Sequence, residues 1–145
     1  MFKIAEALYL NDAYLKEWTA KVVSVNDGGN GHSFVVLDKT AFYPKGGGQP
    51  HDEGVLIKHD KEYKVIFTVK LSGEISNEID NNGNESLKSG DVVQCRLNWE
   101  RRYKLMRMHT ACHVFAGIIH KETGAMITGN QLETDQSRID FSVEQ

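Results

Sequence analysis

Hydrophobic and polar residues alternate along most of the first 98 positions, and this pattern predicts a series of short β-strands. The apolar positions are rich in β-branched residues, and polar or glycine-containing turns separate the segments. The predicted strands cover residues 19–26, 33–38, 54–58, 63–71, 75–79 and 92–98. Short strands with regular turns and no long helix between them are typical of a small β-barrel.

Two smaller features of this region carry predictions of their own. Asn11 or Asp12 is placed to cap a helical turn over residues 13–18, although packing of this segment onto the barrel edge is the favoured alternative. His32 follows a glycine-rich turn and is expected to be an exposed loop residue.

The pattern changes at Trp99 or Glu100. Residues 101–123 lack proline and carry apolar residues at spacings of three and four, which predicts a helix that stops at Gly124. The apolar positions are Leu105, Met108, Cys112, Phe115, Ala116 and Ile119. Residues 138–143 alternate as a strand does.

These elements predict an α+β protein with two domains, a β-barrel over residues 1–98 and the start of a second domain over 99–145. A helix with one or two strands cannot enclose a core alone. We therefore expect the second domain to be incomplete, or to need a partner surface.

Composition narrows the class of protein. The chain has 145 residues, 40% hydrophobic and 26% charged, as expected for a globular protein without a membrane-spanning run. Its two cysteines do not make a disulfide framework, so a reducing cytoplasm is the expected location. A net charge of −3 means that any nucleic-acid binding must rest on a local patch.

His109 and His113 are the first candidate for chemistry. Residues four apart share one face of a helix, so both imidazoles can reach one metal ion. Thr110 stands where a His-Glu-x-x-His metalloprotease requires glutamate, so the sequence fits that class of enzyme poorly. Two ligands complete neither a structural nor a catalytic zinc site, so a pair without metal remains the alternative.

A glycine-rich loop is the second candidate. Gly46, Gly47, Gly48 and Gln49 lie between Pro44 and Pro50. Successive glycines allow a ligand to approach the backbone, and their amides can bind an anion. The loop matches neither a Walker loop nor a dinucleotide fingerprint, and a flexible connection between strands is the alternative.

A basic cluster precedes and enters the predicted helix. It is suited to the phosphates of a nucleic acid, whereas the alternative is that some members pair with carboxylates of the barrel. Its members are Arg96, Arg101, Arg102, Lys104 and Arg107.

Several motifs occur together in one order, and together they are much more specific than any one of them. They lie at 40–44, 46–50 with Asp52 and Gly54, 99–102, 106–113, 128–129 and 137–142. In these segments the chain resembles the alanyl-tRNA editing proteins of the AlaX type and the matching editing region of alanyl-tRNA synthetase.

The resemblance implies a translation-factor-like β-barrel followed by an α/β editing domain. It also implies a trans-editing hydrolase that removes serine, and sometimes glycine, from tRNA(Ala). The family holds Zn²⁺ with a His-x-x-x-His, which matches His109 and His113, and with a later Cys-x-x-x-His that these 145 residues lack. A histidine that the family tends to have after Gly73 is also missing, since Ser76 and Asn77 stand there.

The same resemblance suggests roles for further residues. Thr110 and Thr128 are candidate hydroxyls near the amino-acid pocket, and the glycine-rich loop is expected to help read the serine hydroxyl. Alternatively the loop only tightens the junction between domains. Two rival functions remain, a tRNA-binding module without hydrolysis and a generic barrel protein whose histidine pair is structural.

Overall fold

The computed structural model describes residues 5–142, and within them the chain forms two compact units. The first unit contains residues up to 45 together with 51–99, and the second contains 46–50 and the residues from 100 onward. The loop at 46–50 thus belongs to the second unit, although it is inserted in the sequence of the first.

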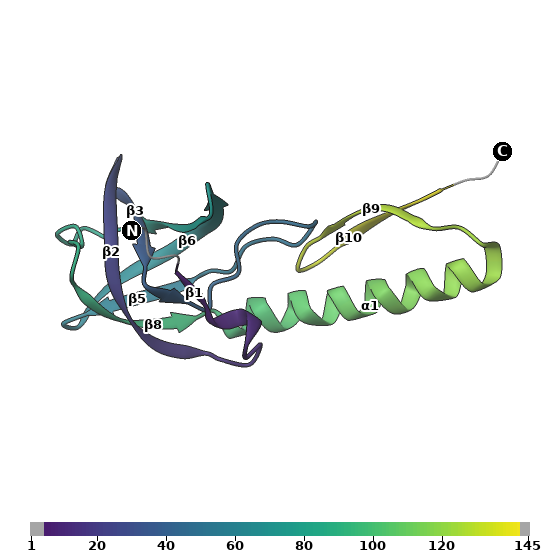
Figure 1. Ribbon diagram of the computed structural model, residues 1–145, viewed down its shortest axis with the longest axis horizontal. Coiled ribbons are helices and arrows are strands. Elements are labelled where there is room, and N and C mark those ends of the chain that lie inside the picture. The colour runs from purple at the N-terminus through teal and green to yellow at the C-terminus, as the bar shows by residue number, and fades with distance from the viewer. Residues whose placement is uncertain (1–4, 143–145) are drawn as a thin grey trace. The chain divides into compact units, whose positions relative to one another are not determined.

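The first unit is a closed antiparallel barrel (Figure 1). Its strands follow one another around the barrel in the order β2-β3-β7-β6-β5-β8. They are β2 (Glu17–Gly29), β3 (His32–Leu37), β5 (Gly54–Lys58), β6 (Lys61–Leu71), β7 (Glu74–Asp80) and β8 (Val92–Leu97). Closure leaves no unpaired edge among these strands, and it confirms the barrel that the alternating pattern predicts.

Three short elements accompany the barrel. Strand β1 (Glu6–Ala7) pairs in parallel with β4 (Lys39–Thr40), and a 3₁₀ turn, η1 (Leu8–Leu10), follows β1. None of these was expected from the sequence, because segments of two or three residues carry no periodic signal.

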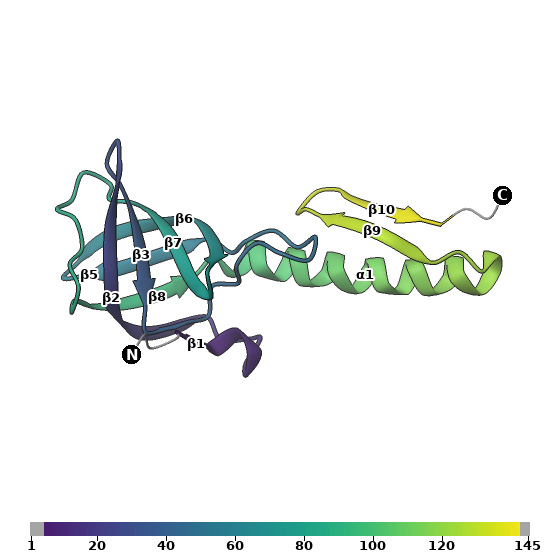
Figure 2. The same cartoon turned by 45° about the horizontal axis from the view of Figure 1, so that its top comes forward.

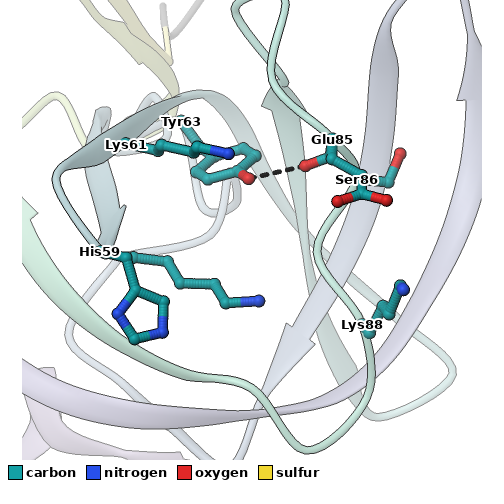
Figure 3. Close-up of a pocket in the computed structure, with 7 residues that line it drawn as sticks. His59, Lys61, Tyr63, Glu85, Ser86 and Lys88 are labelled. Atoms are coloured by element: carbon teal, nitrogen blue, oxygen red, sulfur yellow. Dashed lines mark hydrogen bonds between the residues drawn. The ribbon is translucent and has the colours of Figure 1, made fainter.

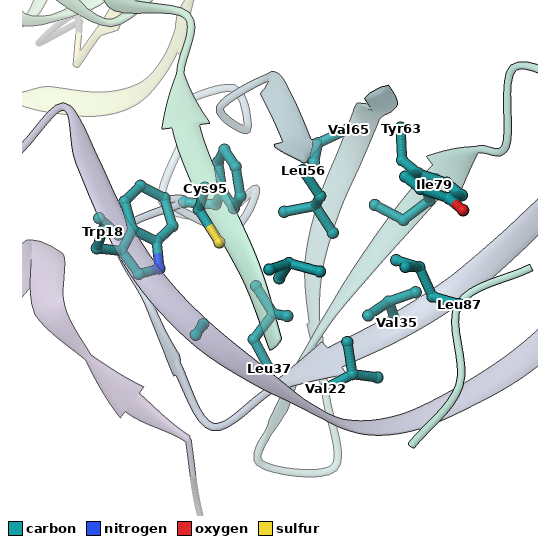
Figure 4. Packing of buried hydrophobic residues seen from close by; sticks show 14 of the residues in the cluster. Trp18, Val22, Val35, Leu37, Leu56, Tyr63, Val65, Ile79, Leu87 and Cys95 are labelled. Atoms are coloured by element: carbon teal, nitrogen blue, oxygen red, sulfur yellow. The ribbon is translucent and has the colours of Figure 1, made fainter. Parts of the chain in front are cut away.

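The barrel core follows directly from the alternation along the strands. In β8, Val93, Cys95 and Leu97 are buried while their neighbours are exposed. Figure 4 shows how the buried side chains of the surrounding strands meet in the barrel interior, with Leu56 and Ile79 among those that are fully buried. Burial also raises the pKa of the Cys95 thiol, which makes it a structural residue rather than a nucleophile.

The second unit consists of one long helix and a hairpin that lies along it (Figure 2). The helix is α1 (Trp99–Thr123), and the hairpin strands are β9 (Ile127–Leu132) and β10 (Ser137–Phe141). The helix ends as predicted at Gly124, whose φ is 75° and whose N–H donates to the His120 carbonyl at 2.7 Å.

The apolar face of the helix is only partly covered within the second unit. Leu105 is fully buried, whereas half of Phe115 is exposed. The ring of Phe115 lies 6.2 Å from that of Phe141 in an edge-to-face arrangement. No helix among the described residues is long and apolar enough to cross a membrane.

Two local interpretations are wrong, the helical turn over residues 13–18 and the loop position of His32. Residues 13–16 form no helical turn, and strand β2 already begins at Glu17. Leu15 instead packs against the barrel core, in line with the favoured alternative. Asp12 accepts a hydrogen bond from the Tyr14 N–H at 2.9 Å, an Asx turn that competes with helix formation.

His32 is the first residue of β3 and is half-buried, with Nδ1 3.3 Å from Glu78 Oε1 on β7. The strand prediction for residues 138–143 is met as far as Phe141, and Val143 lies outside the described residues.

Candidate active site

Helix α1 brings the two histidines together as their spacing predicts. The Nε2 atoms of His109 and His113 are 2.9 Å apart, and the ring centroids are separated by 4.5 Å. Burial lowers the pKa of His109, and the neighbouring His113 lowers it further. A lower pKa keeps the imidazole neutral, which is the form that binds a metal.

The spacing of the pair is close to that of two nitrogen ligands on one zinc ion. Two nitrogens on one tetrahedral zinc ion lie about 3.3 Å apart, given a Zn–N distance of about 2.0–2.1 Å. A small rotation of either ring covers the difference from the observed spacing. Among residues 5–142 no group of three histidine, cysteine or acidic side chains is placed to hold a metal. The described residues therefore offer two donors, one fewer than a catalytic zinc site needs.

The glycine-rich loop is a tight hairpin whose tip contacts β9. Gly46 and Gln49 exchange backbone hydrogen bonds of 3.2 and 3.0 Å, and Gly47 and Gly48 both have positive φ. The Gly48 carbonyl accepts a hydrogen bond from the Leu132 N–H at 2.8 Å. The loop is thus an ordered extension of the hairpin sheet.

Gly48 has no room for a side chain. A Cβ at this position would lie 1.8 Å from Asn130 Oδ1 and 2.7 Å from the Asn130 carbonyl oxygen. Asn130 is a neighbour of the candidate loop that the sequence alone did not identify, because only the close approach to Gly48 reveals it. The glycine requirement here is steric as well as conformational.

Thr128 occupies a special position in β9. The ladder with β10 pairs Gly129 with Asp140 and Ile127 with Phe141, so Thr128 is the extra residue of a β-bulge. Bulges are frequent beside functional sites, where they redirect a side chain. Thr128 and Thr110 are both exposed, and within residues 5–142 neither makes a hydrogen bond to the histidine pair.

A shallow groove of about 320 Å³ runs between α1 and β10. Met108, Cys112 and Phe115 line it from the helix, and Ser137 and Ile139 line it from the strand. Cys112 therefore lies at a half-buried groove wall rather than in a closed core. The apolar helix spacing predicts this face, but the sequence does not show that a groove remains.

The members of the basic cluster differ in their ion pairing and in their exposure to solvent. Arg96 pairs with Glu17 of the barrel at 2.9 Å, and Lys104 lies 3.4 Å from Glu100. Arg102 is only 4% exposed, which favours a structural role, and Arg101 is half-buried. Arg107 is exposed, with its guanidinium 5.9 Å from the centre of the Tyr103 ring. Arg107 is thus the most accessible arginine of the cluster that lies on the helix.

Fold and candidate site together define a two-unit α+β protein, in which an antiparallel barrel precedes a helix bearing a pair of imidazoles. Residues 11–101, more than half of the chain, match the family of class II (A) tRNA synthetases. The chain belongs to this family.

Relatives place the chain more narrowly. It is 52% identical to the alanyl-tRNA editing protein AlaX-M of Methanosarcina mazei, over 97% of this chain and 57% of that protein. The corresponding protein of Saccharolobus solfataricus is 43% identical over 97% of this chain and 58% of its own length. The alanine–tRNA ligase of Pyrococcus furiosus is 40% identical over 93% of this chain and 14% of its own. The resemblance noted from the motifs is thereby confirmed, and the chain spans a little over half the length of its AlaX-M relatives.

Proposed function

We propose that this chain forms part of a hydrolase that edits mischarged tRNA(Ala). The substrate is tRNA(Ala) carrying serine, with the glycyl ester as a second substrate. A water oxygen attacks the ester carbonyl carbon, the bond to the ribose oxygen breaks, and that oxygen takes a proton. The products are the amino acid and uncharged tRNA.

The observation that carries this proposal is the identity to proteins named for alanyl-tRNA editing. It extends over 97% of the chain, so it includes α1 and its histidine pair. A rival reading as a generic barrel protein does not account for this extent of similarity.

In this proposal His109 and His113 hold Zn²⁺. Their Nε2 atoms converge, and the lowered pKa of His109 suits a neutral ligand. Residues 5–142 supply two donors in this proposal, and other groups fill the remaining positions on the ion. When bound, zinc supplies a Lewis acid that polarises an oxygen of the substrate or of water.

The glycine-rich loop and the two threonines surround the amino acid in this proposal. Gly46 to Gln49 form an ordered hairpin on β9, and Thr128 is the bulged residue of the same strand. Thr110 directly follows His109 on the helix. A site that hydrogen-bonds the serine hydroxyl rejects an analogue without it by several powers of ten, which spares alanyl-tRNA.

The test is release of serine from seryl-tRNA(Ala) by this chain with zinc added. We expect the parent to release serine and His109→Ala to lose this activity. His120→Ala is the matched control, because His120 lies on the same helix and its Nδ1 is 3.2 Å from the Ala125 carbonyl rather than beside the pair. Equal release by His109→Ala and the parent would exclude the proposed role of the pair.

A second candidate function is a tRNA-binding module without hydrolysis. It is favoured by the presence of only two metal donors among residues 5–142. In the same assay this alternative predicts tRNA binding without release of serine. Zinc affinity separates the two, since two histidines bind zinc weakly and a complete site binds it tightly.

A further inference from the structure

A cationic pocket lies on the barrel, and none of its residues belongs to the candidate active site. It has a volume of about 140 Å³. Lys61 and Tyr63 of β6 form one wall, and Ser86 and Lys88 of the loop between β7 and β8 form the other (Figure 3). We call it the lysine pocket and define it as Lys58, His59, Lys61, Tyr63, Glu85, Ser86 and Lys88.

The position of this pocket is fixed by the fold. Tyr63 is 2% exposed, and its hydroxyl donates to the Glu85 carbonyl oxygen at 2.6 Å, which ties the loop to β6. Lys58 donates to Asp91 Oδ2 at 2.9 Å, and Asp91 also accepts from the Lys88 N–H at 2.8 Å. These bonds hold the two walls in place.

The charges in the pocket do not cancel. The ion pair with Asp91 neutralises Lys58. Lys61 and Lys88 are both exposed, and within residues 5–142 neither ammonium is in an ion pair. Glu85 is the one carboxylate among the lining residues, so it opposes two unpaired lysines. The local excess is positive in a protein whose net charge is −3.

The size and polarity of the pocket indicate its ligand. It is smaller than the roughly 300–1,000 Å³ of pockets that enclose a whole drug-sized molecule, so it takes one small anionic group. Ammonium groups and a serine hydroxyl are donors suited to phosphate oxygens. The exposed walls leave the remainder of a larger molecule in solvent.

We propose that the lysine pocket binds one backbone phosphate of tRNA. The choice of tRNA rests on the proposed editing function, whereas the phosphate chemistry rests on the pocket itself. A contact on the barrel adds an anchoring point to the basic residues of α1, and it acts on binding rather than on hydrolysis.

The experiment measures the affinity of this chain for tRNA(Ala) at several salt concentrations. The main variant is Lys61→Ala combined with Lys88→Ala. Both side chains are exposed, so the fold is expected to persist, and thermal unfolding checks this. Lys70→Ala is the matched control, because Lys70 is an exposed lysine of β6 outside the pocket.

We expect the double variant to reduce the magnitude of the negative slope of log affinity against log salt by about 1, which corresponds to roughly tenfold weaker binding at 0.1 M salt. Glu85→Gln should have the opposite effect and strengthen binding, because it removes the opposing charge and keeps the carbonyl that Tyr63 uses. Lys70→Ala should match the parent.

Equal slopes for the parent, the double variant and Lys70→Ala would overturn the proposal. Inorganic phosphate is the second probe. If it shifts the amide resonances of His59 and Ser86 while tRNA affinity stays independent of the pocket, the site takes a free anion and the tRNA assignment is wrong. Serine release is measured on the same samples, so loss of editing through His109→Ala is distinguished from loss of binding through the pocket.

Discussion

The packing of Gly48 against Asn130 leads to a prediction about how the glycine-rich loop is held. Replacing Gly48 by alanine places a Cβ at a φ of +80°, which costs about 1–2 kcal/mol for a residue with a side chain. The Asn130 amide can rotate away, but its backbone carbonyl, 2.7 Å from the new atom, cannot. The loop must therefore leave β9.

Undocking also breaks the hydrogen bond from the Leu132 N–H to the Gly48 carbonyl, which is worth about 1 kcal/mol. The parent loses this bond on undocking too, so the bond cancels in the comparison. The strain of about 1–2 kcal/mol at a φ of +80° lowers the ratio of docked to undocked loop by roughly 5- to 30-fold, at about 1.4 kcal/mol for each factor of ten, and the contact with the Asn130 carbonyl lowers it further. Amide hydrogen exchange at Leu132 reports this ratio directly, because that N–H bonds to the loop.

The loop contains its own controls. Gly46→Ala meets nothing within 4 Å and has no positive φ, so exchange at Leu132 should stay unchanged. Gly47→Ala also meets nothing within 4 Å but has a φ of +60°, so its effect should be intermediate, roughly 5- to 30-fold. Exchange in α1 checks that the unit remains folded. Equal exchange at Leu132 in Gly46→Ala and Gly48→Ala would refute the steric argument.

Three further predictions concern stability. Leu56→Ala, at a fully buried barrel position, should lower the free energy of unfolding by about 2–5 kcal/mol in a denaturant titration, whereas Leu71→Ala, at an exposed position, should change it by less than about 0.5 kcal/mol. The pKa of Asp91 is lowered by hydrogen bonds from Lys58 and from the Lys88 N–H, so its contribution is present above its unfolded pKa of about 3.9 and is lost as pH falls through the folded value. The stability difference between the parent and Asp91→Asn should therefore shrink in unfolding measurements below about pH 4, and a constant difference would contradict the assignment. Gly117→Ala meets nothing within 4 Å and lies inside α1, so it should slow amide exchange of the helix in line with a gain of about 0.5–1 kcal/mol.

The periodic pattern of apolar residues predicted the long helix and the barrel strands, because an element buried on one face must carry apolar residues at regular spacing. The span of β5 was predicted in full, and α1 begins two residues before its predicted start. Strand β9 (Ile127–Leu132) was missed because its sequence, Ile-Thr-Gly-Asn-Gln-Leu, is mostly polar and its burial does not alternate. Pairing with β10, rather than its own composition, makes it a strand.

The candidate site likewise has features that the sequence predicted and features that it did not. Spacing on one helix predicted the approach of His109 and His113, because a helix fixes the relation between residues four apart. The contact between Gly48 and Asn130 joins segments more than 80 positions apart, and no local rule relates them. The burial of Arg102 could not be predicted from a cluster of like charges, since arginine is seldom buried.

Burial is distributed unevenly between the two units, and this bears on how the site works. Most of the buried hydrophobic residues belong to the barrel, whereas in the second unit Leu105 and Leu132 are the buried hydrophobic side chains within the described range. A unit with few buried apolar contacts opens at low cost in free energy. Ligands that bind only its ordered form then add their binding energy to its stability. In the proposed site, the second unit binds the metal and the aminoacyl end of the tRNA, and the docked loop adds further contacts. Each of these three should order the unit and so favour the other two. The stable barrel would remain nearly unaffected, which is why amide exchange resolved by residue separates the effects on the two units better than a single unfolding temperature.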